Sequence, residues 1–398
     1  MVTFCIWGEN IMQVTAENKK VPPTYSRTNP FHAKVLKNIN LNGADSSKET
    51  RHIELSLQGS GLSYNPGDAL GIVPSNDPQL VSSIIEEMHW DAETAVTINK
   101  QGETLALKDA LTIYFEITLL SKKILQQAAE FTDNEELKNL VLVENTDKLK
   151  AYTDGRDLLD MLREFGPWKA TAQEIVSLLR KMTPRLYSIA SSISAHPDEV
   201  HLTIGAVRYT AHGRDRKGVC SVQVAERVTE GETLPVFVQP NKHFHLPESG
   251  DKDIIMVGPG TGIAPFRSFI EERAVTKAAG KSWLFFGDQH AATDFLYQDE
   301  LEKYQKEGTL AKLETAFSRD SEKKVYVQHK MEESSKELYE WLENGAYFYV
   351  CGDKTYMAKD VHNMLLNIIE KEGGKTLEEA EAYLIDLKKA GRYQRDVY

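Results

Sequence analysis

Apolar and polar residues alternate near the start of the chain. Residues 32–41 and 49–57 show the period of two that is typical of strands with one buried face. The turn-forming stretch NGADSS lies between them, and residues 64–74, rich in glycine and proline, predict a turn, a short strand and another turn. We therefore expect this region to form antiparallel strands.

The pattern changes after Pro74. Residues 76–90 repeat apolar side chains at helical spacing, as at Leu80, Ile84 and Met88. Further short helices are predicted at 104–115, 121–131, 134–142, 157–165 and 171–182. The strand period then returns at 185–192, 199–209, 218–228 and 233–240. We interpret this order as one antiparallel barrel, residues 25–75 and 183–247, interrupted by a helical insertion, residues 76–182.

A third pattern starts at Asp253, where short apolar runs alternate with amphipathic helices. Strands are predicted at 253–258, 281–289, 311–319 and 346–353, and helices at 265–278, 294–308, 325–345 and 354–374. Such alternation predicts a doubly wound parallel α/β sheet in a domain of residues 248–398. Residues 1–24 are expected to be a leader or linker, because prolines favour extended chain just before residue 25.

Composition narrows the class of protein. The chain has 398 residues, a net charge of −12 and three cysteines without a CxxC pair. The negative charge argues against a general nucleic-acid binder, and fits either docking to a basic partner or simple solubility. The cysteines indicate a reducing compartment such as the cytoplasm, with no disulfide or metal site expected. No apolar run is long enough to span a membrane.

The segment VGPGTGIAPFR, residues 257–267, is the strongest local signal. It follows an apolar strand and precedes a helix, which is the context of a phosphate-binding loop. Gly258, Gly260 and Gly262 permit a tight turn and a close approach of the backbone to a ligand. The helix start would offer its free N–H groups to a pyrophosphate. The alternative is a glycine-rich turn that binds nothing, but the context favours the phosphate site.

Residues 318–328 form a second candidate cluster. Ser318, Arg319, Lys324, Tyr326 and Gln328 supply cations, donors and an aromatic ring, which suit the 2′-phosphate and adenine of NADP better than NAD. An ordinary charged surface loop accounts for the same residues equally well.

Two further segments could contact a dinucleotide. Arg185 and Tyr187 share one face of a short strand, whereas Ser188 points the other way, so the strand either binds a ligand or is plain sheet. Gly218 to Ser221 resemble a second phosphate turn before a helix start.

Cys351 and two histidines complete the candidates. Cys351 ends a predicted strand beside Gly352, at the edge where open α/β sheets bind ligands, but a buried cysteine is also ordinary packing. His243 and His245 form a pair without a third ligand, and we interpret them as structural.

These segments together resemble a known family. RLYSIASS, GVCS, GPGTGIAPFR, FFGD, SRD with KVYVQ, YVCGD with MAKD, and terminal RYQRDVY occur in the order found in diflavin reductases. Within that family the sequence is similar to the flavoprotein (α) subunits of NADPH-dependent sulfite reductases, over residues 25–398. The resemblance implies an FAD-binding barrel, an inserted helical connecting domain and a C-terminal NADP-binding domain.

The resemblance also implies roles for individual residues. FAD would be bound by Thr97, Arg185, Leu186, Tyr187, Ser188, Thr203, Ile204, Gly205, Tyr209, Gly218, Val219, Cys220 and Ser221. NADPH would be bound by Gly260, Thr261, Gly262, Ser318, Arg319, Lys324, Tyr326, Gln328 and Asp360. Ser188, Cys351 and Asp396 match the trio that assists hydride transfer. Tyr398 matches the aromatic residue that stacks on the flavin and has to move before the nicotinamide can bind.

The onward electron acceptor is left open by the resemblance. The family carries an N-terminal flavodoxin-like FMN domain, whereas only 24 residues precede the matching region here. The expected partner is an FMN-binding or flavodoxin-like carrier, or a sulfite reductase haemoprotein. One alternative is a stand-alone NADPH–flavodoxin or ferredoxin reductase, and another is a non-catalytic module that holds FAD only for docking.

Overall fold

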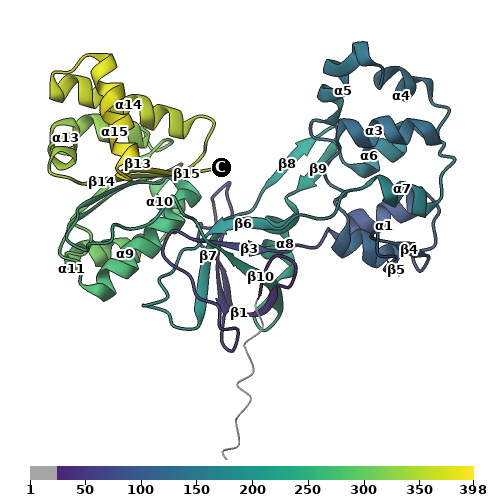
Figure 1. Ribbon diagram of the computed structural model, residues 1–398, viewed down its shortest axis with the longest axis horizontal. Coiled ribbons are helices and arrows are strands. Elements are labelled where there is room, and N and C mark those ends of the chain that lie inside the picture. Colours follow the sequence, from purple (N-terminus) through teal and green to yellow (C-terminus); the bar gives the residue numbers. More distant parts are fainter. Residues whose placement is uncertain (1–24) are drawn as a thin grey trace, which may run out of the picture.

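An antiparallel sheet forms the centre of the molecule (Figure 1). The computed structural model describes residues 25–398, so the leader or linker expected at residues 1–24 lies outside the described residues. The strand order is β6-β3-β10-β1-β2-β7. The strands are β1 (Phe31–Asn40), β2 (Thr50–Ser56), β3 (Ala69–Ile72), β6 (Arg185–Ser188), β7 (Glu199–Gly205) and β10 (Thr233–Gln239). A bridge between Ile189 and Leu202 joins the two outer strands, which closes the sheet into a barrel.

The barrel core is filled by the alternate side chains that the strand period predicts. Ile53 and Leu202 are cross-strand partners and are fully buried. The segment 218–228, predicted as a strand, is instead helix α8 (Val219–Arg227), so that prediction was wrong. Cys220 and Val224 are spaced by one helical turn and both pack into the barrel core, and the same valine-rich sequence also alternates with a period of two.

A helical region is inserted between β3 and β6 and forms the right-hand lobe of Figure 1. Its helices are α1 (Pro78–Glu87), α2 (Leu107–Asp109), α3 (Lys122–Ala128), α4 (Glu135–Leu140), α5 (Thr146–Thr153), α6 (Leu158–Glu164) and α7 (Ala172–Leu178). The start of the helix predicted at 104–115 is instead strand β5 (Thr104–Ala106), which pairs with β4 (Ala95–Thr97). The region has a hydrophobic core of its own.

A hairpin connects the helical region to the barrel. Strands β8 (Arg208–Ala211) and β9 (Arg214–Lys217) project from the barrel toward α6. The segment 199–209, predicted as one strand, is therefore divided between β7 and β8. Buried Arg216 contacts Asp157 and Asp160 at 2.7 Å each, and Arg214 contacts the same two carboxylates. Such doubly bonded buried pairs fix one geometry between the two regions.

A five-stranded parallel sheet forms the left-hand lobe, in the order β13-β12-β11-β14-β15 (Figure 1). The strands are β11 (Ile254–Val257), β12 (Ser282–Asp288), β13 (Lys312–Phe317), β14 (Tyr347–Gly352) and β15 (Tyr393–Val397). The helices are α9 (Ala264–Thr276), α10 (Ala291–Asp294), α11 (Gln298–Glu307), α12 (Val327–Glu333), α13 (Ser335–Glu343), α14 (Met357–Gly373) and α15 (Leu377–Lys389). The antiparallel barrel and the doubly wound sheet confirm the predicted fold class.

The C-terminal segment is part of this sheet. Strand β15 runs parallel to β14 and places Asp396 opposite Cys351. Backbone hydrogen bonds from Tyr398 to Gly352 and from Lys354 to Tyr398 extend the pairing to the last residue. The end of the chain is therefore fixed beside the carboxyl end of β14.

Candidate functional site

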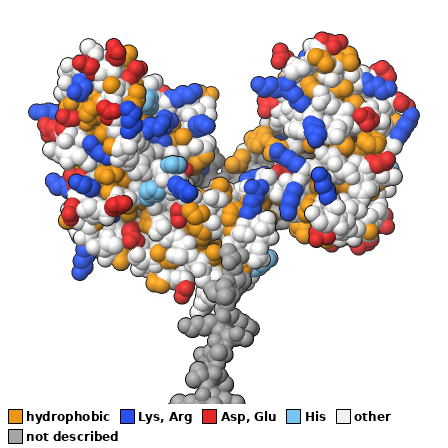
Figure 2. Space-filling model, in the orientation of Figure 1, with side chains coloured by type: hydrophobic (Ala, Val, Ile, Leu, Met, Phe, Trp, Pro, Cys, Tyr) orange, Lys and Arg blue, Asp and Glu red, His pale blue; other side chains and the backbone are white. Residues whose placement is uncertain are grey.

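Two adjoining cavities run from the barrel to the parallel sheet. The larger has a volume of about 1080 Å³ and the smaller about 510 Å³. Arg185, Gly218 and Val219 line both, so the cavities form one continuous depression. It lies below the gap between the two lobes in Figure 2. Its extent suits an elongated ligand with a phosphate near its middle.

The start of helix α8 forms the barrel side of the depression. Gly218 precedes the helix, and its N–H donates to the carbonyl of Val207 at 2.8 Å. A Cβ atom at Gly218 would lie 2.5 Å from Ser221 Oγ, so glycine is needed for this close packing. The first N–H groups of the helix have no acceptors within the helix and can bind a phosphate.

Arg185 supplies a fixed positive charge beside that helix start. Its Nη2 lies 3.0 Å from Glu116 Oε2, and its Nη1 donates to Thr183. Burial disfavours the charged form of Glu116, but hydrogen bonds from Thr118 and Arg185 outweigh this and lower the pKa of Glu116. The guanidinium is therefore held in place before any ligand binds. A helix start, a glycine and a fixed cation together fit the pyrophosphate of FAD.

Ser188, Cys351 and Asp396 meet at the junction of the barrel and the sheet. Ser188 Oγ donates to Asp396 Oδ2 at 2.7 Å, across 208 positions of sequence. Burial raises the pKa of Asp396, although the hydrogen bond from Ser188 opposes this. Burial and the nearby Asp396 raise the pKa of the Cys351 thiol well above its ordinary value. The thiol is thus neutral near pH 7, which makes it a packing and polar contact and a poor nucleophile.

Tyr398 lies at the mouth of the larger cavity. Its side chain is 63% exposed, and its hydroxyl is 2.9 Å from Thr261 Oγ1. This hydroxyl contact and the backbone bonds at Gly352 and Lys354 hold the residue in place. The ring can therefore leave its position without disturbing a packed core.

The glycine turn after β11 depends on close backbone contacts. A Cβ atom at Gly262 would lie 2.2 Å from the carbonyl oxygen of Cys351, and one at Gly258 would lie 2.5 Å from the carbonyl oxygen of Gly262. Gly260 has φ +57°, a conformation that favours glycine. Pro265 occupies the first turn of α9, as the sequence predicts. The turn therefore packs tightly against the end of β14.

The predicted adenosine site lies at the carboxyl end of β13 and the start of α12. Arg319 and Lys324 are exposed and make no ion pair within residues 25–398. Gln328 Nε2 lies 3.4 Å from Asp360 Oδ2, and the ring of Tyr326 is 43% exposed. Free cations beside an exposed ring provide what a 2′-phosphate and an adenine need.

The predicted residues are not all brought together. The larger cavity is lined by Arg185, Leu186, Tyr187, Ser188, Thr203, Gly205, Gly218, Val219, Cys220, Ser221, Gly260, Thr261 and Tyr398. Tyr209 lines the smaller cavity. Ile204 is fully buried in the barrel core, and Thr97 lies on β4 in the helical lobe, outside the lining of both cavities. Gly262 supports the turn from behind the lining.

Lys48 and Asp288 were missed by sequence reasoning. Lys48, on the loop between β1 and β2, lines the larger cavity, and its Nζ lies 2.5 Å from Asp288 Oδ1. Burial raises the pKa of Asp288, and its second carboxylate oxygen has no hydrogen-bond partner. The FGD ending of β12 could have indicated Asp288, whereas Lys48 lies in a loop without a motif.

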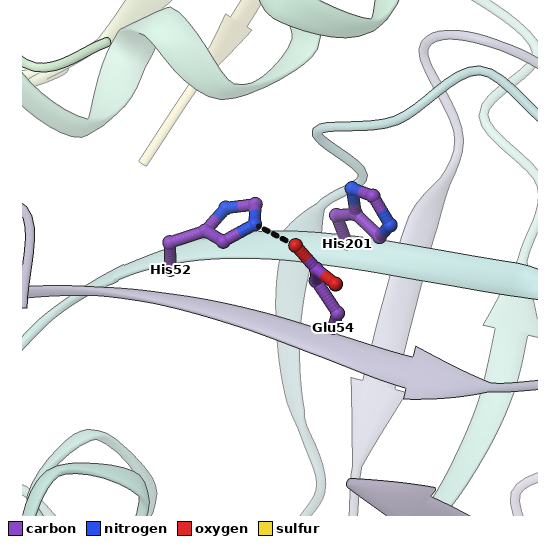
Figure 3. A group of neighbouring side chains, drawn as sticks. All are labelled: His52, Glu54 and His201. Carbon is purple, nitrogen blue, oxygen red and sulfur yellow. Dashed lines mark hydrogen bonds and ion pairs between the residues drawn. The ribbon is translucent and has the colours of Figure 1, made fainter. Parts of the chain in front are cut away.

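A buried histidine cluster joins the barrel to the sheet domain (Figure 3). His52 contacts Glu54 at 3.0 Å and Tyr297 at 2.9 Å, and Arg267 lies 3.4 Å from His201 Nδ1. Burial, and then the charge of Arg267, lower the pKa of His201 to about 2. Since an arginine only donates, His201 Nδ1 accepts and its Nε2 carries the proton toward Glu199. This arrangement is an interdomain polar network rather than a vacant ligand set.

Comparison with known proteins gives two matching families. The FAD binding domain matches residues 23–222, and the oxidoreductase NAD-binding domain matches residues 256–363. The chain is 62% identical to the sulfite reductase [NADPH] flavoprotein alpha-component of Bacillus subtilis, over 94% of this chain and 62% of that protein. It is 47% identical to the proteins of the same name from Aliivibrio fischeri and Vibrio cholerae, over 94% of this chain and 61% and 60% of theirs. The chain thus spans about 60% of the length of these relatives. Among the described residues, no helix is long and apolar enough to cross a membrane.

Proposed function

The chain belongs to the FAD binding domain family, and on that premise we propose that it is an NADPH-dependent flavoprotein reductase. It takes hydride from NADPH to FAD and passes electrons onward to a carrier. The hydrogen bond between Ser188 and Asp396, beside Cys351 in the cavity that contains the α8 start, is the observation that carries the proposal. Residues 25–75 and 183–247 act as the FAD domain, 76–182 as the connecting domain and 248–398 as the NADP domain.

FAD, when bound, supplies the hydride acceptor, and the protein supplies position and electrostatics. Gly218 and the first turn of α8 bind the FAD pyrophosphate, and Arg185 adds its fixed charge. Ser188 orients its hydroxyl by donating to Asp396. Asp396 can hold a proton near neutral pH, because burial raises the pKa of its carboxyl. Tyr398 excludes water from the cavity until a nicotinamide replaces its ring.

NADPH is proposed over NADH because of the unpaired cations at the adenosine site. Arg319 and Lys324 bind the 2′-phosphate, and Tyr326 packs on the adenine. Gly260, Thr261 and Gly262 bring the backbone close to the pyrophosphate, and Gln328 and Asp360 complete the site.

The test uses the FAD-loaded chain under anaerobic conditions. NADPH is expected to bleach the flavin absorbance, and NADH is expected to do so much more slowly. A flavin that stays oxidised with NADPH would support the non-catalytic docking module instead. Equal rates with NADH and NADPH would refute the assignment of residues 318–328.

The onward partner is proposed from the names of the relatives, which describe one component of sulfite reductase. We expect the isolated chain to reduce ferricyanide but not sulfite with NADPH as the donor. Adding a sulfite reductase haemoprotein, with and without an FMN-binding carrier, then identifies which of the two accepts the electrons. Activity with a flavodoxin or ferredoxin alone would favour the stand-alone reductase. The free, buried thiols of Cys220 and Cys351 suit the cytoplasm.

A further inference from the structure

Strand β15 leaves an open edge on the parallel sheet. It is the last strand in the sheet order and pairs with β14 on one side. The carbonyl of Arg392 accepts from Phe348, and the N–H of Tyr398 donates to Gly352, so the even-numbered residues face β14. In a parallel ladder the N–H and C=O of one residue point to the same side. The main-chain groups of Tyr393, Arg395 and Val397 therefore face outward.

A groove of about 1160 Å³ follows this edge. Helices α14 and α15 form one wall, and the linker between the barrel and the sheet, residues 242–252, forms the other. The side chains of Leu384 and Tyr393 contribute buried apolar surface, and Ile385 is 52% exposed. The groove is separate from the cavities that contain Ser188 and Gly218, because its lining includes neither residue.

Positive charge is concentrated along the groove. The cations in its lining are Lys242, Lys252, Lys354, Lys388 and Arg395. All five are exposed, and within residues 25–398 none of them forms an ion pair. Two carboxylates, Glu248 and Glu381, lie in the same lining. Figure 2 shows lysines, arginines and histidines gathered on the side of this lobe that faces the central hollow. This excess is unusual in a chain with a net charge of −12.

We propose that this groove binds an extended acidic segment of a partner protein, which adds as a further strand to β15. Strand addition supplies main-chain hydrogen bonds, and the apolar floor and basic rim select the side chains. Acidic side chains would pair with cations that have no partner in the chain itself. The inference concerns a surface outside the proposed redox site and does not depend on its chemistry.

Neither protection of the strand edge nor self-association accounts for the groove as well. A charged residue on an edge strand protects against aggregation, but four of the five cations come from outside β15 and surround a hollow. A second copy of the chain pairing through β15 would bring two sets of unpaired cations together, which costs free energy.

Binding is tested with a labelled peptide and the FAD-loaded chain. The probe is a fluorescein-labelled ten-residue peptide that alternates glutamate with valine, and the control alternates lysine with valine. Fluorescence anisotropy is expected to give at least about tenfold tighter binding for the glutamate peptide, weakened by salt. A third peptide, N-methylated at alternate residues, cannot complete the ladder and is expected to bind about tenfold more weakly. Equal binding of the methylated peptide, or no binding of the glutamate peptide, would overturn the proposal.

Charge-reversal variants locate the site. Lys242→Glu combined with Lys388→Glu should weaken glutamate-peptide binding at least about tenfold and leave NADPH–ferricyanide activity unchanged. Lys303→Glu combined with Lys306→Glu on α11 makes the same charge change on another exposed surface and should leave binding unchanged. Equal loss in both pairs would mean a non-specific charge effect and would overturn the site.

Hydrogen exchange separates strand addition from a looser contact. The amides of Tyr393, Arg395 and Val397 should exchange more slowly when the glutamate peptide is bound. Unchanged exchange at these amides, or a concentration-dependent dimer that the Lys242→Glu/Lys388→Glu pair abolishes, would overturn the proposal.

Discussion

The barrel side and the sheet side of the large cavity hold their ligand-facing groups differently. On the barrel side, Arg185 is already paired with Glu116 at 3.0 Å, and Gly218 is packed against Ser221. On the sheet side, Arg319 and Lys324 make no ion pair in the described part of the chain, and Tyr398 is 63% exposed. The first arrangement suits a cofactor that stays bound, and the second suits one that exchanges in every turnover.

The junction between the two sides should show the largest effect. Asp396→Ala removes the acceptor of the Ser188 hydroxyl, so we expect the NADPH-dependent reduction of FAD to slow about 100-fold. FAD content should not change, because Asp396 lies outside the α8 turn. Stopped-flow absorbance measures the rate, and loss of FAD from this variant would contradict the division between the two sides.

The sheet side should control the choice of nicotinamide cofactor. Replacing both Arg319 and Lys324 with alanine removes two charge-assisted contacts, so the KM for NADPH should rise about 30-fold. The KM for NADH and the FAD content should stay constant. Steady-state kinetics with both cofactors provides the measurement, and an equal rise in the KM for NADH would show that these cations act on something other than the 2′-phosphate.

Tyr398 should contribute to the same preference through access. Tyr398→Ser removes the ring that a nicotinamide has to displace, so the ratio of kcat/KM for NADPH to that for NADH should fall about tenfold. Tyr398→Phe keeps the ring and loses only the contact with Thr261. It should behave like the wild type, and a matching change in both variants would assign the effect to the hydroxyl.

The barrel side should respond to a change that the sheet side ignores. Gly218→Ala places a Cβ atom 2.5 Å from Ser221 Oγ, which can rotate away at the loss of its bond to the N–H of Val207. We expect FAD affinity to fall about fivefold, measured by flavin fluorescence on dilution. NADPH affinity should be unchanged, and a loss of both affinities would mean that the two sides are not independent.

The smallest expected effect is on stability against pH. Burial raises the pKa of Asp396 in the folded state, so folding favours its protonated form, and this contribution is lost as pH rises through the raised pKa. Asp396→Asn mimics the protonated form at every pH. Its Tm relative to the wild type should therefore increase by about 2 °C between pH 4 and pH 8. Calorimetry checks this, and a constant difference would mean that the folded pKa is not raised.

Local patterns predicted most of the elements, because the strands are buried runs and the helices show clear periodicity. Helix α8 was misread because its valines satisfy both periods, and only the neighbouring barrel decides between them. Strand β15 gave no strand signal, since an edge strand with polar residues depends on its partner β14.

The candidate site was predicted unevenly. The glycine turns and the Ser188–Cys351–Asp396 trio carry recognisable motifs. The contact between Lys48 and Asp288 spans 240 positions and belongs to no motif, so only the fold reveals it. Thr97 matches a pattern of the family, but the structure places it in another lobe, on β4.

The two ends of the helical insertion are neighbours in the barrel sheet. Ile72 of β3 is paired with Arg185 of β6, so the chain leaves and re-enters the sheet at adjacent positions. A short hairpin turn could replace the whole intervening segment without breaking a ladder of the barrel. The barrel alone would keep its sheet but lose Glu116 and, with it, the restraint on Arg185. The insertion thus behaves as a removable graft that a smaller ancestor could have acquired in one step, with a gain in how firmly the FAD phosphate is held.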